Sequence, residues 1–144
     1  MARTSPSVAE TSALAITEEH QDLAEAVSGQ LARLDALAQA RSTLAGGATH
    51  PADIWSAASE LGWTGLALAE EHGGSGFGLG EVAVVLECLG RHLAPGPFLP
   101  TVCAAVVLDR YAPDTVAAQL LPSLANGQTV AALGMAGTVA VGAD

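Results

Sequence analysis

Cys88 and His92 are the two residues of this chain whose spacing best suits nucleophilic catalysis. They lie four positions apart in a segment with helical periodicity, so that an imidazole could contact a thiol and activate it. Ser75 lies close to both in sequence, but no third group that would activate a nucleophile is visible. The simpler interpretation is that Cys88 packs in the core and His92 lies at the C-terminal end of a helix, where a cation is favoured.

Glu70, Glu71 and His72 form a second group, which suggests an acid–base pair or a metal site. Adjacent residues point in different directions, whereas helical metal motifs place their ligands four residues apart on one face. The other three histidines also lack partners at ligand spacing. The sequence therefore predicts no metal site.

The run GGSGFG that follows invites interpretation as a nucleotide-binding loop. The dinucleotide-binding fingerprint requires glycine at relative positions one, three and six. Counted from Gly74 the sixth position is Leu79, and counted from Gly76 it is Glu81. The run also lacks a preceding βαβ context, so it is predicted to be a connecting loop.

The elements that must position these residues begin with a long helix. Thr17 is suited to cap it, and the pair Gly46–Gly47 marks its end. One face of this helix is apolar at Leu23, Val27, Leu31, Leu34 and Leu37. A second helix begins at Pro51 and ends before Gly62, which suits the left-handed position that closes a helix. Its predicted inner face consists of Ile54, Trp55, Ala58 and Leu61.

The rest of the chain alternates further helices with glycine or proline breaks. The segment 63–68 is apolar, short and broken by glycine, so it is predicted to be extended. Helices are predicted over 81–91, over 101–110 and from Pro113 towards Leu124, with Pro122 ending or bending the last one. From Thr129 onwards, β-branched and small residues predict one or two strands. The predicted fold is therefore all-α, with five helices in orthogonal packing.

Composition excludes several functions. All five basic residues are arginines, so the chain lacks the lysine of Schiff-base chemistry and of a Walker-type phosphate loop. The net charge of −10 argues against nucleic acid and against anionic membrane surfaces. No apolar run approaches the ~20 residues that a membrane-spanning helix needs, and no secretion signal is visible. The two cysteines are expected to be small buried hydrophobes in a reducing cytoplasm.

The order of these elements, with the GGSGFG loop and the later turn LECLGRHLAPGP, resembles the amino-terminal helical domain of the acyl-CoA dehydrogenases. The resemblance covers roughly residues 16–144. It implies a tail over residues 1–13, a helical domain over 14–128, and the start of a β-barrel domain over 129–144. Family members continue into that barrel and a carboxy-terminal helical bundle, which carry the catalytic glutamate and most of the FAD and CoA contacts. No catalytic residue is therefore predicted in this chain.

The resemblance also nominates site residues. In the family, the proline-rich corner and the next helix help to wall the acyl-chain cavity, which here implies Pro97, Phe98, Thr101 and Val102. The family's flavin-contacting segments fall, without gaps, on residues 137–139 and 142–144. The nominated cofactor positions are Gly137, Thr138 and Ala143, where the family's hydroxyl-bearing Thr and Ser are replaced by Gly137 and Ala143.

Two functions follow as expectations. The chain is either the helical domain of a FAD-dependent acyl-CoA dehydrogenase, or a non-catalytic pairing module that docks on a true dehydrogenase subunit. Either way, a homo- or hetero-oligomer is expected, because the apolar faces of the third and fourth helices exceed what five short helices can cover. These faces consist of Val82, Val85, Leu86, Val102, Ala105 and Val106.

Overall fold

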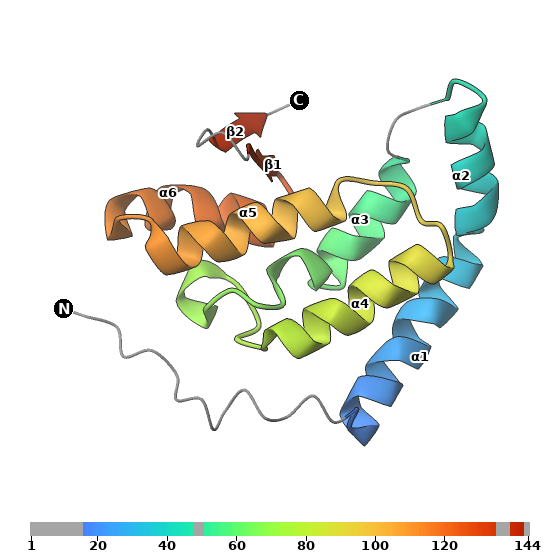
Figure 1. The fold of residues 1–144 in the computed structure, drawn as a ribbon, viewed down its shortest axis with the longest axis horizontal. Helices are drawn as coiled ribbons and strands as arrows, with labels where there is room; N and C mark the ends of the chain where they lie inside the picture. Colours follow the sequence, from blue (N-terminus) through green and yellow to red (C-terminus); the bar gives the residue numbers. More distant parts are fainter. Residues whose placement is uncertain (1–15, 48–50, 135–138, 143–144) are drawn as a thin grey trace.

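The computed structural model describes residues 16–47, 51–134 and 139–142, and these form a helical body that carries a small β-hairpin (Figure 1). Helices account for most of the described residues, as the alanine- and leucine-rich sequence predicts. In chain order the elements are α1 (Glu18–Arg33), α2 (Ala36–Leu44), α3 (Ala52–Glu60), the 3-10 turns η2 (Trp63–Gly65) and η3 (Glu70–His72), α4 (Leu79–Arg91), α5 (Phe98–Tyr111), α6 (Asp114–Ala125), β1 (Val130–Leu133) and β2 (Val139–Gly142). The expected tail over residues 1–13 lies outside the described residues.

The long first helix of the prediction is in fact two helices, so the described residues hold six helices and not five. The break is at Asp35, whose backbone is left-handed at φ +48°. Aspartate tolerates this conformation better than most residues, and its side chain then accepts a hydrogen bond from Ala38 N–H at the start of α2. Because the chain turns there, Leu37 does not continue the inner face of α1 and is 43% exposed.

The predicted extended segment after α3 is also different in the structure. Gly62 has the expected left-handed backbone at φ +73°, but Trp63 and Thr64 form a 3-10 turn that is buried. The tight turn directs Trp63 into the core, where it is 4% exposed. Leu61, predicted to face inwards, is the residue that ends α3 and is 53% exposed.

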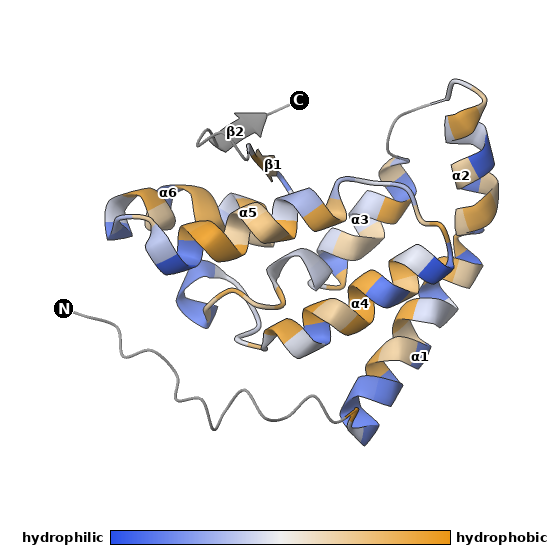
Figure 2. Cartoon of the chain, viewed as in Figure 1, coloured by the Kyte–Doolittle hydropathy of each residue, from blue (hydrophilic) through white to orange (hydrophobic). Residues whose placement is uncertain are grey.

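The core consists of two clusters of apolar side chains that meet along α5. The first joins α1, α3, α4 and the start of α5, and the second joins the rest of α5 to α6, Leu68 and β1. Figure 1 shows α5 running across the body, with α6 and the hairpin beside it. Figure 2 shows hydrophilic residues at the start of α1 and hydrophobic residues along α5 and α6. Helix α5 is therefore the element that joins the two halves of the core.

The apolar faces that were expected to remain open are covered by the chain itself. Val82, Val85, Val102 and Ala105 are at most 5% exposed, and Leu86 and Val106 are half-buried against the first core cluster. Helix α1 packs against α4 and β1 packs against α5, so these elements cover the apolar faces that five short helices would leave open. The argument for association that rested on these six residues is therefore wrong.

The hairpin continues the helical body at its C-terminal end. β1 and β2 are antiparallel, with Val130 opposite Gly142 and Leu133 opposite Val139. Ala131 of β1 is 3% exposed and belongs to the second core cluster. The first strand is therefore packed into the helical core. Among the described residues, no helix has the length and apolar character needed to cross a membrane.

Candidate functional site

The proline-rich corner places three of the four residues predicted to wall an acyl cavity inside the protein. Pro97 is half-buried and precedes the first turn of α5. Phe98 and Val102 are 5% and 4% exposed and belong to the first core cluster. Thr101 is fully buried. These side chains therefore contact this chain's own core, and their part in a substrate cavity remains a prediction.

Thr101 faces the hairpin. Its hydroxyl oxygen lies 3.3 Å from the backbone N of Ala131 and 3.3 Å from the backbone O of the same residue. The hydroxyl accepts from the N–H and donates to the carbonyl, so both backbone groups of Ala131 are satisfied by one side chain. Thr101 thus links α5 to β1.

The outward face of α5 carries apolar side chains that the sequence did not single out. Leu99, Cys103, Val107 and Tyr111 are exposed and follow one another at intervals of four residues. Such spacing places side chains along one side of a helix. Helix α5 is apolar on nearly every side, so its periodicity could not separate the covered face from the open one. The exposure of Cys103 also corrects the prediction that both cysteines are buried, whereas Cys88 is buried as predicted.

The junction between α6 and β1 is held by two more side chains from distant parts of the sequence. Thr64 donates its hydroxyl hydrogen to Ala125 O at 2.6 Å, in the buried interior. Trp55 Nε1 donates to Gly127 O at 2.8 Å. Both carbonyls lie beyond the last helical hydrogen bonds of α6, where backbone acceptors need outside partners. The end of α6 is therefore fixed by α3 and η2.

The glycine-rich loop is a connector, as predicted. The N–H groups of Ser75, Gly76 and Phe77 bond to carbonyls of residues 65, 68 and 66 at 2.9–3.0 Å, so they are already engaged and not free to bind a phosphate. Gly74 is required by space, because a Cβ there would lie 2.2 Å from Leu68 O.

His72, at the end of the acidic segment, meets carboxylates but not a metal-binding group. Its Nε2 lies 3.8 Å from Glu71 Oε1 and 4.0 Å from Oδ1 of Asp109, which comes from α5 and was not anticipated. Within residues 16–47, 51–134 and 139–142, no group of three or more His, Cys, Asp or Glu side chains is placed to hold a metal ion.

Cys88 has structural partners on α1. Ser28 Oγ donates to its sulfur at 3.6 Å, and the thiol lies 3.7 Å from Ala24 O as a donor. The side chain is 3% exposed. This confirms the interpretation of Cys88 as a small core residue.

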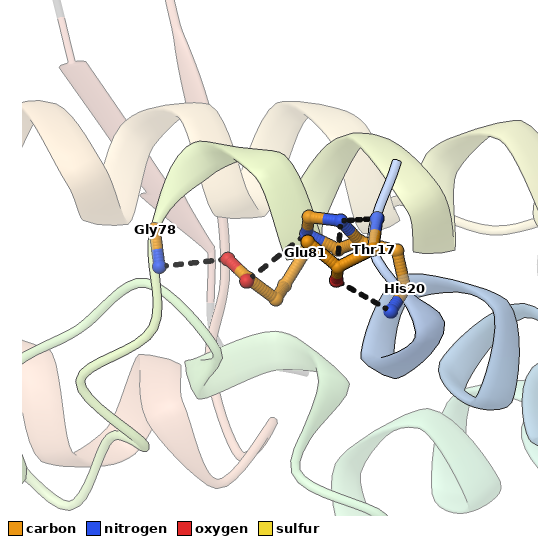
Figure 3. Close-up of polar contacts among 4 residues, drawn as sticks. All are labelled: Thr17, His20, Gly78 and Glu81. Atoms are coloured by element: carbon orange, nitrogen blue, oxygen red, sulfur yellow. Dashed lines mark hydrogen bonds and ion pairs between the residues drawn. The ribbon is translucent and has the colours of Figure 1, made fainter. Parts of the chain in front are cut away.

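A polar cluster at the other end of the body joins α1 to α4 (Figure 3). Thr17 caps α1 as predicted. His20 Nδ1 accepts a hydrogen bond from Thr17 N–H at 3.2 Å, so the ring proton is on Nε2. This Nε2 faces Glu81 Oε1 at 3.1 Å. Glu81 Oε2 accepts from Gly78 N–H at 2.9 Å. Partial burial alone would raise the pKa of Glu81, but hydrogen bonds from the backbone of Glu81 and Gly78 and from His20 lower it below 4.5.

The three positions predicted to contact flavin, Gly137, Thr138 and Ala143, lie outside the described residues. Between them, Val139–Gly142 forms strand β2. Glycine and alanine have no side-chain hydrogen-bond donor, so the residues at 137 and 143 do not match a hydroxyl-based flavin site.

Comparison with known proteins places these observations in one family. A family model described as acyl-CoA dehydrogenase, N-terminal domain, matches residues 17–128. The acyl-CoA dehydrogenase IpdE2 of Mycobacterium tuberculosis is 36% identical over 118 residues, which are 81% of this chain and 36% of that protein. IpdE2 of Mycolicibacterium smegmatis is 32% identical over 65% of this chain and 30% of its own length. The chain thus spans about a third of the length of these relatives.

A solved structure agrees with the sequence comparisons. The Tcur3481-Tcur3483 steroid ACAD G363A variant superimposes with a TM-score of 0.70 at 29% identity, over 79% of this chain and 31% of that one. The shared fold covers most of the residues described, and the predicted all-α architecture is confirmed. The chain therefore belongs to the acyl-CoA dehydrogenase family, and its helical body is the family's N-terminal domain.

Proposed function

We propose that this chain is the helical part of a FAD-dependent acyl-CoA dehydrogenase, which removes hydrogen from the α and β carbons of an acyl-CoA thioester. The observation that carries the proposal is the match of residues 17–128 to the family's N-terminal domain, together with the shared helical fold. Because the chain spans about a third of its relatives, the activity belongs to the complete enzyme, and no catalytic residue is assigned here.

The proposed contribution of the chain is one wall of the acyl cavity, with a role in packing subunits. Phe98, Thr101 and Val102 would support the wall from behind, because all three are buried, while the half-buried Pro97 stiffens the corner. The surface itself would be the outward face of α5 at Leu99 and Cys103. An apolar surface suits an acyl tail, since burial of apolar area contributes about 25 cal/mol per Å².

The cofactor is assigned to the complete enzyme and not to this chain alone. Of the three nominated positions, Thr138 has a hydroxyl, whereas Gly137 and Ala143 offer only backbone N–H groups. We therefore expect FAD to be held mainly by residues that this chain does not contain.

The same two positions favour a second candidate, a non-catalytic pairing module of a heteromeric dehydrogenase. A subunit that does not bind flavin has no need of the hydroxyls that are replaced at Gly137 and Ala143. Under both candidates the chain acts in the cytoplasm within a homo- or hetero-oligomer of dehydrogenase subunits, without nucleic acid. A complete β-barrel encoded downstream in frame favours the first candidate. A complete dehydrogenase encoded nearby, with no such continuation, favours the second.

The test is co-expression of the tagged chain with a full-length acyl-CoA dehydrogenase subunit, followed by purification through the tag. We expect a complex that carries flavin absorbance and oxidises acyl-CoA. Replacing Cys103 by Phe should then reduce turnover of long acyl-CoA relative to short acyl-CoA, because the larger ring narrows the cavity. The matched control is Ala118→Phe on the exposed surface of α6, which should leave that ratio unchanged. A colourless chain that never binds the subunit would contradict the second candidate.

A further inference from the structure

Thr101 makes an unusual contact for a helix residue, because a single hydroxyl group engages both backbone groups of Ala131. In a β-strand the N–H and C=O of one residue point towards the same edge. Both groups of Ala131 therefore face α5, and β2 pairs along the opposite edge of β1. The Thr101 hydroxyl thus occupies the place that a neighbouring strand would take.

The surroundings make this contact a fixed one. Thr101 is fully buried and Ala131 is 3% exposed, so water does not compete for these hydrogen bonds. The two residues are 30 positions apart, and α6 and its C-terminal turn lie between them in the sequence. A hydroxyl that moved by one residue along β1 would meet groups that point to the other edge. The contact therefore determines one register of β1 on the helical body.

We infer that Thr101 is a positioning residue that sets the register of β1 on α5 and hence the direction in which the chain enters the β-hairpin. This inference rests on the contacts of Thr101 and Ala131, and its consequence for the enzyme rests on the proposed function, since the segment after β1 is the one that the family places beside flavin. The Thr101 hydroxyl occupies the edge of β1 that faces α5 at Ala131, so no further strand can pair with β1 at that position.

Two other contacts at the junction between α6 and β1 have a different structural role. Thr64 and Trp55 hold the carbonyls of Ala125 and Gly127, which end α6. They fix where the helix stops, four to six residues before Ala131. Thr64 therefore provides a matched control, because it is also a threonine, is 1% exposed, and donates its hydroxyl to a backbone carbonyl.

The test measures amide hydrogen exchange in the 144-residue chain and in three variants. Thr101→Val keeps the shape of the side chain but removes both hydrogen bonds, and Thr101→Ser keeps the hydroxyl. In Thr101→Val we expect the exchange rate of the Ala131 amide to rise about tenfold relative to the rates of amides in α1 and α4. In Thr101→Ser the rate at Ala131 should remain near that of the original chain. Thr64→Val should destabilise the chain without this local rise.

The outcomes separate positioning from general packing. Equal effects of Thr101→Val and Thr64→Val at Ala131, or failure of Thr101→Ser to restore protection, would overturn the inference. If Thr101→Val does not fold, the inference is tested instead by the NMR signal of the Thr101 hydroxyl proton in the unmodified chain. A slowly exchanging hydroxyl signal with a cross-peak to the Ala131 amide supports the inference, and its absence from a folded sample contradicts it. None of these measurements depends on flavin or acyl-CoA, so they remain independent of the proposed function.

Discussion

His20 Nε2 lies 3.1 Å from Glu81 Oε1 and joins the first turn of α1 to the first turn of α4. The imidazole sits beside Gly80, where a Cβ would come within 3.3 Å of Nε2. Both side chains are partly buried, at 15% and 26% exposure. The pair therefore joins two helices that are far apart in the sequence and that contribute six of the thirteen buried residues of the first core cluster.

Replacing Glu81 by Gln should lower the free energy of unfolding by about 1 kcal/mol. The carboxylate accepts one hydrogen bond on each oxygen, from His20 and from Gly78 N–H. An amide has a single oxygen, so one of these donors would face an NH₂ group. Urea denaturation of the variant measures the loss. Glu87→Gln on the exposed side of the same helix is the control and should change stability by less than about 0.5 kcal/mol. Equal losses in the two variants would contradict a specific role for Glu81.

The lowered pKa of Glu81 predicts a dependence of stability on pH. A carboxyl group whose pKa is lower in the folded state than in the unfolded state stabilises the fold above its unfolded pKa. The ordinary value is 4.5, so this contribution is complete above that pH and is lost as the pH falls through the folded pKa. The melting temperature of the original chain should therefore fall more steeply below this pH than the melting temperature of Glu81→Gln. Parallel pH profiles would show that Glu81 titrates at its ordinary pKa.

Gly127→Ala should destabilise the chain severely. The backbone there is left-handed at φ +71°, and a Cβ would lie 1.8 Å from Ser59 Oγ. Gly46 is the matched control, because its φ of +90° is also left-handed but no atom of the described residues lies within 4 Å of an added Cβ. We expect Gly46→Ala to cost about 1 kcal/mol through backbone strain and Gly127→Ala to cost at least 2 kcal/mol more through the clash. Similar melting temperatures for the two variants would refute the predicted steric conflict.

The two cysteines should react very differently with a thiol-alkylating reagent. Cys103 is exposed on the outward face of α5, whereas Cys88 is 3% exposed and hydrogen-bonded to α1. Mass spectrometry of the native chain should show one adduct, and of the chain in denaturant two adducts. Cys103→Ala should remove the native adduct, and Cys88→Ala should leave it. Rapid alkylation of Cys88 in the native chain would mean that α1 and α4 separate readily.

Local patterns in the sequence predicted the features that depend on neighbouring residues. Thr17 was recognised as a helix cap, Gly62 as a left-handed helix end, and Cys88 as a core residue, because capping, backbone conformation and helical periodicity act within a few positions. The order of these elements was also enough to recognise the family. The break at Asp35 was missed, since a left-handed conformation is uncommon for any residue other than glycine.

The tertiary structure alone decided which faces are covered and which distant groups meet. The family resemblance nominated Thr101 and Val102 for the wall of an acyl cavity, but both are buried in the structure, whereas Leu99 and Cys103 are exposed. Helix α5 is apolar around most of its circumference, so its periodicity could not separate the two faces. The contacts His20–Glu81 and Thr101–Ala131 span 61 and 30 positions, respectively. A single sequence carries no periodic signal at such separations. The composition and local spacing of the residues thus determined the helices and the family, and the long-range packing of those helices determined which side chains are covered and which distant groups meet.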